Sequence, residues 1–208
     1  MKFLITSAFA RSPADFVGQH VALWSPVNMR FMQMHENENA GKSSGFVGVL
    51  QDEKINPGNL EEWRTWERFE VVDAGNGQIA LHHTLSNRFL RLFGEDVDGF
   101  GGVQGNTLPA GWEFERFTVV PVANGTVALH NARNNKFIRM VDGCCVDAKG
   151  GLKNTDELPA EWRSEQWEVI LHPLDYAAHT ASAAASANAT PLPEAAPVEG
   201  EKDEWMII

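Results

Sequence analysis

A leucine and a phenylalanine recur three times along the chain at a constant separation, and this repeat constrains the fold more than any other feature. The separation is eight residues in each copy, and the pairs are Leu23 and Phe31, Leu81 and Phe89, and Leu129 and Phe137. A second similar block follows each pair, at residues 66–72, 114–120 and 164–170. The step from this block to the next leucine is also constant, at twelve residues from Phe69 to Leu81 and from Phe117 to Leu129. Two spacings that agree predict one structural unit present in three copies.

Each element of the repeat has the pattern of a short β-strand, because aromatic and β-branched residues alternate with polar ones. The predicted third strands of the copies are residues 46–50, 102–104 and 145–148. Asn-Gly pairs beginning at Asn76 and Asn124 provide the two positive φ angles of a type I′ hairpin turn. Four strands in each of three copies make twelve, and threefold closure of such strands removes the unpaired edges of an open sheet.

The succession Val-Ala-Leu-His, Asn-Lys-Phe-Ile-Arg, a short Val-x-Ala strand and Trp/Phe-Glu-x-Phe resembles the fascin-like, actin-crosslinking branch of the β-trefoils. The resemblance covers about residues 18–172 and implies an all-β fold, a single β-trefoil of three four-strand repeats. It also implies a protein partner, with actin as the candidate. Fascin-like proteins bundle actin with several trefoils together, whereas this chain has one, so bundling is not implied.

The predicted trefoil is flanked by an N-terminal extension at 1–17 and a C-terminal tail at 173–208. The tail is acidic and rich in Ala and Pro, and we expect it to be disordered because it has too little bulky apolar surface to offset the entropy of ordering. The expected repeat boundaries are about 18–72, 73–120 and 121–172. The first repeat is the longest, and its residues 42–59 form an enlarged loop of the kind that often carries function.

The charge and the cysteines limit the partners and the compartment. A net charge of -11 argues against sequence-independent binding to nucleic acid, which draws its free energy from cations that neutralise phosphates. No apolar run approaches the roughly 18 residues of a membrane span. Cys144 and Cys145 are adjacent and cannot close a long loop by a disulfide, which fits a reducing compartment. The first ten residues superficially resemble a signal peptide, but Thr6 and Ser7 interrupt the apolar stretch, so we predict a cytoplasmic protein.

Motifs for catalysis and for cofactor or metal binding are incomplete. Asp96 and Asp98 lie in a glycine-rich segment that is expected to be a solvated turn, because two acids fall short of the six or more oxygens that calcium needs. His82, His83 and His130 follow matching strands, which favours packing or hydrogen bonding over a zinc site. The sequence therefore predicts a protein that is not an enzyme and binds no metal or cofactor.

The candidate partner-binding residues are mainly basic residues that recur beside the repeated phenylalanines. They are Arg30, Arg88, Arg91, Lys136 and Arg139, together with Trp205 in the C-terminal segment. Cations gathered in symmetry-related positions of an acidic protein would suit acidic partners such as actin subunits or anionic glycans. The alternative is that they pair with carboxylates of neighbouring strands, at about 0.2–1 kcal/mol each.

Two functions remain open. The leading interpretation is a non-enzymatic protein-interaction or scaffold module, with actin as the implied partner. The alternative is a carbohydrate-binding, lectin-like β-trefoil, which requires an exposed Trp or Phe beside Asn, Asp or His. The Gln-x-Trp repeat of ricin-type lectins is not present, since Gln166 directly precedes Trp167. A protease inhibitor acting through one loop is a weaker third option.

Overall fold

The computed structural model describes residues 13–36, 45–49, 54–60, 64–100, 106–141, 145–148 and 158–171. Within these ranges the strands are β1 (His20–Ser25), β2 (Arg30–Glu36), β3 (Gly45–Val49), β4 (Phe69–Gly75), β5 (Gln78–His83), β6 (Arg88–Phe93), β7 (Asp96–Phe100), β8 (Thr118–Pro121), β9 (Val127–Asn131), β10 (Lys136–Phe137), β11 (Arg139–Val141), β12 (Cys145–Asp147) and β13 (Glu168–Leu171). The helical elements are short 3₁₀ turns, η1 (Pro13–Phe16), η3 (Pro57–Asn59) and η4 (Ala123–Gly125). Because β10 and β11 are one strand interrupted at Ile138, the described ranges contain the twelve strands that the repeat predicts.

Six strands close into a barrel. The ring runs β1, β4, β5, β8, β9, β13 and back to β1, with all pairs antiparallel. Two of its contacts are single bridges, Ile79 of β5 with Phe117 and Val127 of β9 with Trp167, where Phe117 and Trp167 directly precede β8 and β13. The fold is therefore the all-β trefoil that the sequence predicts.

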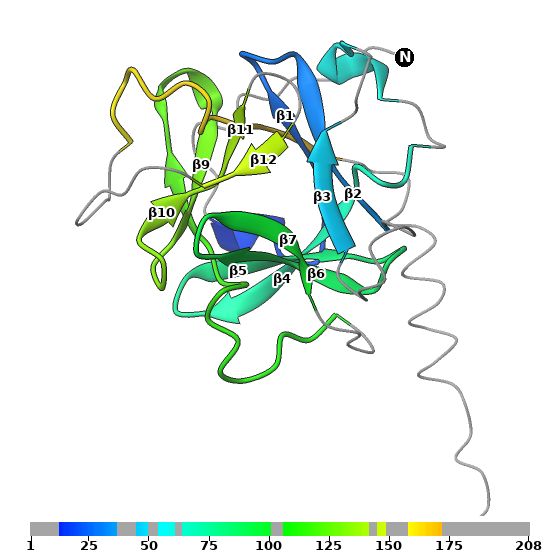
Figure 1. Ribbon diagram of the computed structural model, residues 1–208, viewed down its shortest axis with the longest axis vertical. Coiled ribbons are helices and arrows are strands. Elements are labelled where there is room, and N and C mark those ends of the chain that lie inside the picture. Colours follow the sequence, from blue (N-terminus) through cyan, green and yellow to red (C-terminus); the bar gives the residue numbers. More distant parts are fainter. Residues whose placement is uncertain are drawn as a thin grey trace, which may run out of the picture.

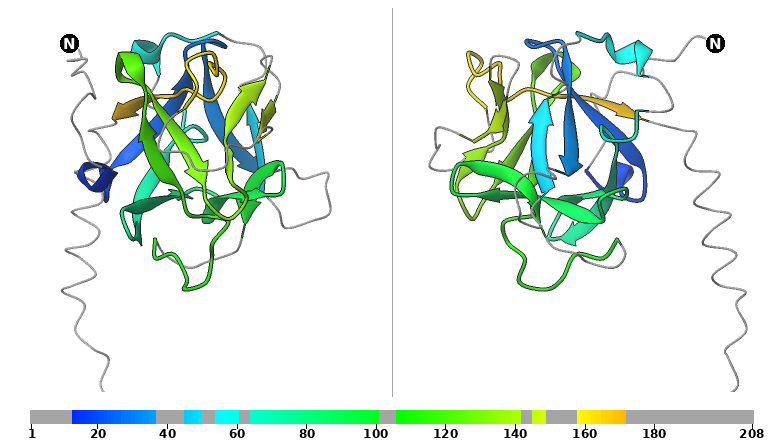
Figure 2. Two further views of the ribbon diagram at one scale, coloured as in Figure 1. Left: turned by 90° about the vertical axis from the view of Figure 1, so that its left-hand side faces the viewer. Right: turned by 45° about the vertical axis from the view of Figure 1, so that its right-hand side comes forward.

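Three hairpins cover one end of this barrel. They are β2–β3, β6–β7 and β10/β11–β12, and their second strands pair with one another in a cycle of β3 with β7, β7 with β12 and β12 with β3. Figure 1 shows β3, β7 and β12 gathered around a common centre. In Figure 2 (left) these strands lie on the side of the molecule opposite η1. The described end of the predicted N-terminal extension thus packs on the other end of the barrel, where Phe16 is buried.

The three copies occupy equivalent environments, as the constant spacings predict. Leu23, Leu81 and Leu129 are buried together in one central core. The phenylalanines Phe31, Phe89 and Phe137 are each fully buried in separate outer clusters, one per copy. The turns that precede them also match, because the residue two positions before each phenylalanine has a positive φ, of 56° at Met29, 51° at Asn87 and 52° at Asn135. A pseudo-threefold axis therefore relates both the core and the turns.

The two predicted Asn-Gly turns are confirmed. Asn76 and Gly77 have φ values of 56° and 74°, and Asn124 and Gly125 have φ values of 69° and 81°. Asparagine and glycine tolerate this left-handed region better than other residues, which explains why they stand between adjoining barrel strands.

The third strand of the second copy is a correction to the sequence prediction. It is β7, at Asp96–Phe100, where a solvated turn was expected, and the predicted strand at 102–104 lies outside the described residues. A two-residue turn at Gly94, which has a φ of 68°, returns the chain directly into β7. Val97 then faces the core, and Asp96 and Asp98 point outward. Gly99 faces Met34 so closely that a Cβ there would lie 2.7 Å from the methionine sulfur.

Several predicted features lie outside the described residues. They are Trp205, the tail at 173–208, most of the N-terminal extension, and residues 42–44 and 50–53 of the enlarged loop. In the part of the chain that the structure describes, no helix is long and apolar enough to cross a bilayer.

Candidate binding site on the second hairpin

The outer face of the β6–β7 hairpin carries alternating side chains that the core does not use. Inward-facing Leu90, Leu92 and Val97 are buried in the central core. The outward-facing residues form three cross-strand pairs, which are Phe89 with Phe100, Arg91 with Asp98 and Phe93 with Asp96. Because strand residues alternate between faces, the pattern that turns the leucines into the central core places Arg91, Phe93 and Phe100 on the outer face, where Phe89 is buried in the outer cluster of its copy.

Arg91 lies between two exposed phenylalanine rings. Its guanidinium carbon is 4.1 Å from the centroid of Phe100 and 5.5 Å from that of Phe93, distances typical of cation–π contacts. The side chain of Phe93 is 55% exposed and that of Phe100 is 40% exposed. Asp98 holds the guanidinium in place, since Arg91 Nε donates to Oδ1 at 2.8 Å and Nη2 donates to Oδ2 at 2.5 Å. This bidentate geometry fixes the plane of the guanidinium.

Two further rings extend this arrangement on either side. Phe114, from the segment before β8, meets Phe93 edge-on with ring centroids 5.0 Å apart. Trp112 comes from the same segment, and its ring centroid lies 5.2 Å from that of Phe100 and 6.3 Å from that of the buried Phe89. We call the four rings of Phe93, Phe100, Trp112 and Phe114 the aromatic strip. Its rings are in contact at both ends, and Arg91 fills the gap in the middle.

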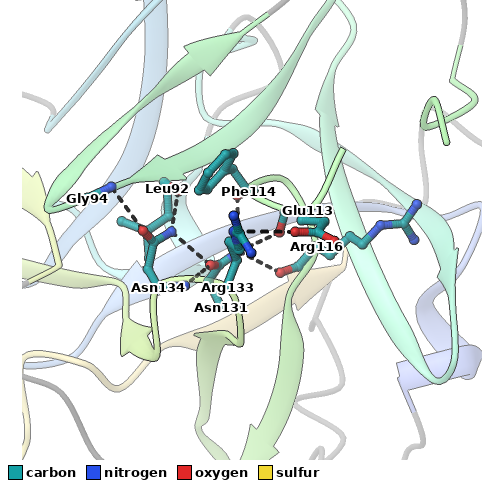
Figure 3. Close-up of polar contacts among 8 residues, drawn as sticks. All are labelled: Leu92, Gly94, Glu113, Phe114, Arg116, Asn131, Arg133 and Asn134. Atoms are coloured by element: carbon teal, nitrogen blue, oxygen red, sulfur yellow. Dashed lines mark hydrogen bonds and ion pairs between the residues drawn. The ribbon is translucent and has the colours of Figure 1, made fainter. Parts of the chain in front are cut away.

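The turn that follows β9 in the third copy fixes the position of Phe114 and of the hairpin (Figure 3). Asn131 is fully buried, and its Nδ2 lies 3.0–3.2 Å from the carbonyl oxygens of Glu113, Phe114 and Arg116. Asn134 donates from Nδ2 to the carbonyl of Leu92 at 2.6 Å and accepts from the Gly94 N–H at 3.0 Å. Two asparagines from another copy therefore position the backbone on which the aromatic strip is built.

An exposed ion pair borders the strip at Phe114. Arg133 Nε lies 3.4 Å from Glu113 Oε2, and the two side chains are 60% and 57% exposed. The Arg133 guanidinium carbon is also 5.9 Å from the centroid of the Phe114 ring. At such exposure the pair contributes little to stability, so its main effect is to place one charge of each sign beside the ring.

The predicted basic residues are distributed over all three hairpins. Arg91 lies in the aromatic strip, and Arg139 makes the equivalent bond to Asp147 at 2.6 Å in the third copy. Lys136 contacts Glu95 at 2.8 Å. Arg91, Arg139 and Lys136 are thus each paired with a carboxylate, as the alternative interpretation of the basic residues predicts. Arg30 and Arg88 are partly buried at the starts of their strands. A role of all these residues in partner binding stays a prediction.

The candidate residues predicted from the sequence do not include the phenylalanines of the strip. Phe89, Arg91 and Phe93 follow one another at a spacing of two residues, which would have placed them on one face of a strand. The third copy carries the same Arg–Asp pair and a tryptophan equivalent to Trp112, at Trp162. It lacks two of the other rings, because Val141 and Ser164 stand where the second copy has Phe93 and Phe114. The aromatic strip is therefore a feature of the second copy and not a consequence of the repeat.

A shallow pocket lies elsewhere on the barrel wall. It has a volume of about 250 Å³ and is lined by Val17, Gly18, residues 70–73 and residues 106–108. In it the Asn106 Nδ2 donates to Glu70 Oε1 at 2.6 Å. The lining holds polar groups but no aromatic ring, so it lacks the stacking surface that the strip provides.

Buried glutamates lie at equivalent positions under the three hairpins, at Glu67, Glu115 and Glu165. Burial raises the pKa of each carboxyl above its ordinary value of 4.5. At Glu115 the nearby charge of Arg91 lowers the carboxyl pKa and so offsets part of the effect of burial. The nearby charge of Asp98 raises the same pKa. In the described ranges no group of three or more His, Cys, Asp and Glu side chains is arranged to hold a metal ion.

The fold and this face define the chain as a β-trefoil protein with an exposed aromatic face. Similar solved structures include an endo-β-galactosidase from Clostridium perfringens that releases GlcNAcα1-4Gal, at 16% identity and a TM-score of 0.50. That match covers 74% of this chain and 32% of the galactosidase, so the chain spans about a third of that protein. The Haemophilus ducreyi cytolethal distending toxin matches at 8% identity and a TM-score of 0.51, over 82% of this chain and 88% of the toxin chain. A β-trefoil named BEL matches at 10% identity and a TM-score of 0.51, over 79% of this chain and 99% of the BEL chain.

A scan against models of protein families gave no match. A search of curated protein sequences also gave none. The structural likenesses support the trefoil part of the predicted resemblance, and membership of the fascin-like branch stays a prediction.

Proposed function

We propose that this chain is a non-enzymatic binding module that binds a carbohydrate through the aromatic strip. The observation that carries the proposal is the pair of exposed rings, Phe93 and Phe100, on either side of the fixed Arg91–Asp98 pair. A sugar ring has apolar C–H faces and polar hydroxyl edges. Exposed aromatic rings suit the faces, and a few fixed polar groups suit the hydroxyls, which is the usual composition of a small-ligand site.

The positions of these groups support the proposal further. An exposed aromatic surface on a soluble domain usually marks a contact site, because burying it elsewhere would be favourable. Phe93 and Phe100 lie on a hairpin whose inner face is packed in the central core, so their positions are preorganised and binding costs little ordering entropy. One protein with a similar fold, the galactosidase, is named for its action on a glycan.

The test is glycan-array screening followed by titration of the best ligand with the variant Phe93→Ala/Phe100→Ala. Loss of both rings is expected to weaken binding by about 10- to 100-fold, since each ring contributes on the order of 1 kcal/mol. Val27→Ala is the matched control, because Val27 is 50% exposed on the first copy and its loss removes apolar surface elsewhere. Equal affinities for the double variant and the control would contradict the proposed site.

The second candidate is the protein-interaction or scaffold function, with actin as the partner implied by the fascin-like resemblance. Phe93 and Phe100 beside Arg91 also favour it, because aromatic residues and arginine dominate the hot spots of protein interfaces. This candidate predicts co-sedimentation with filamentous actin that the double variant abolishes. A single trefoil with one such face would bind filaments without crosslinking them, since crosslinking needs two sites. A cytoplasmic location is part of this candidate and is likewise proposed.

A further inference from the structure

We infer that the aromatic strip selects neutral glycans and discriminates against sulfated, phosphorylated or carboxylated ones. This inference rests on the proposed carbohydrate-binding function and adds the charge class of the ligand. It runs against the expectation from sequence, in which the recurring basic residues suit an anionic partner.

The cation at the centre of the strip is already neutralised. Both nitrogens of Arg91 that contact Asp98 are committed to a bidentate bond, at 2.8 Å and 2.5 Å. The two side chains are only 19% and 22% exposed, so water screens this pair less than it would a surface pair. A sulfate or carboxylate that approached the remaining N–H groups of Arg91 would lie close to the Asp98 carboxylate, whose negative charge opposes the attraction of the arginine.

The cations at the edges of the strip are paired in the same way. Arg133 is paired with Glu113 beside Phe114. Lys136 is paired with Glu95, which lies in the turn between β6 and β7. Arg91, Arg133 and Lys136 thus each have a carboxylate oxygen within 3.4 Å.

Two carboxylates near the strip come in addition to these three pairs, one exposed and one buried. Asp96 is exposed and lies directly opposite Phe93 in the hairpin register. Glu115 is buried beneath the hairpin, where it interacts with both Arg91 and Asp98. The local charge is thus negative or neutral, in keeping with a net charge of -11 for the whole chain. An anionic ligand meets repulsion that a neutral one does not.

The available hydrogen-bonding groups also suit neutral hydroxyls. A carboxylate offers about four lone-pair positions, so Asp98 can accept from sugar hydroxyls while it keeps both bonds to Arg91. Asp96 offers further acceptor positions on the same outer face. Hydroxyl groups donate to such acceptors, whereas sulfate and carboxylate groups cannot. The strip therefore combines stacking surface with acceptors, which is the complement of an uncharged sugar.

The test compares matched pairs of glycans that differ only by one sulfate or one sialic acid, titrated against the full chain at low and high salt. Neutral members are expected to bind at least about tenfold more tightly, with affinities that change little with salt because no net ion pair forms. Asp96→Asn is expected to narrow this ratio by improving binding of the charged members. Glu161→Gln is the matched control, because Glu161 is an exposed carboxylate on the third copy and its loss changes the net charge equally.

Each outcome decides the inference. Tighter binding of the charged members, or a steep loss of affinity with salt, would overturn the neutral preference and leave the carbohydrate function standing. If Asp96→Asn and Glu161→Gln reduce the ratio of neutral to charged glycan affinity equally, only the net charge of the protein matters. That result would overturn the role of the strip in the preference. Silence towards every glycan would overturn the inference together with the proposed function.

Discussion

Replacing Trp167 with alanine is expected to destabilise the fold by about 3–5 kcal/mol, the usual cost of truncating a fully buried aromatic residue. The side chain of Trp167 is 0% exposed in the central core, and its Nε1 donates to the carbonyl of Ile138 at 3.2 Å. Its backbone exchanges two hydrogen bonds of 2.8 Å with Val127, which close the barrel between the last copy's strands. Truncation would leave a cavity at the point of closure. Denaturant unfolding followed by tryptophan fluorescence or circular dichroism measures the loss.

The repeat provides the matched variant for this prediction. Phe69 and Phe117 occupy the positions equivalent to Trp167 in the other two copies, and both are fully buried. Trp167→Phe should therefore cost less than half of the alanine loss, because phenylalanine already fits this site twice. If Trp167→Phe and Trp167→Ala destabilise the protein equally, the three positions are not equivalent and the threefold account of the core is wrong.

Acidification from pH 7 to pH 4 is expected to remove about 3 kcal/mol of stability through His83 alone. Burial lowers the pKa of this histidine from 6.5 to about 4, because the charged imidazolium is desolvated. The folded state then binds fewer protons than the unfolded state between these two values. Stability is fully present above pH 6.5 and is lost as the pH falls towards 4. The ring is held by Ser86 Oγ at 2.7 Å and by the Thr65 carbonyl at 3.3 Å, so it cannot easily move into solvent.

The third copy again offers the variant, because Asn131 stands where the second copy has His83 and likewise contacts a backbone carbonyl of the preceding copy. His83→Asn is expected to flatten the dependence of unfolding free energy on pH between 4 and 6.5. The raised pKa values of the buried glutamates act in the opposite direction, since their stability contribution falls as the pH rises above 4.5, and they are present in both proteins. Subtracting the pH profile of unfolding free energy of the His83→Asn variant from that of the unsubstituted protein therefore gives the contribution of His83. Identical profiles would show that His83 does not titrate in this way.

The fold follows from the sequence wherever a repeated spacing and a turn agree. Leu23, Leu81 and Leu129 recur in register with the phenylalanines, and Asn-Gly pairs mark two barrel turns. Three copies that each leave an apolar face uncovered can bury it only against one another, which makes closure the physical consequence of the pattern.

The strand β7 could not be predicted because its local composition points the other way. Asp96, Asp98 and Gly99 favour a turn by their intrinsic preferences, yet pairing with β6 and burial of Val97 determine the outcome. Gly99 is required for a different reason, the close approach of Met34 from another hairpin, and this contact is visible only in three dimensions.

The candidate site was predicted only in part for a similar reason. The sequence makes Arg91 a candidate partner-binding residue because it recurs with the repeat. The rings around it come from two strands and from the segment that carries Trp112 and Phe114, which the sequence separates and the hairpin register brings together. Partner binding by Trp205 stays a prediction, since that residue lies outside the described part of the chain.

The most direct test of carbohydrate binding by the aromatic strip is an NMR titration of the protein, labelled with ¹³C in its phenylalanine rings, with the neutral oligosaccharide that binds best on an array. The account predicts that the ring signals of Phe93 and Phe100 shift progressively, with Phe114 following. The buried rings of Phe31 and Phe137 in the other copies should stay unchanged. Saturable binding that leaves Phe93 and Phe100 unshifted would contradict the account and place the sugar elsewhere on the barrel.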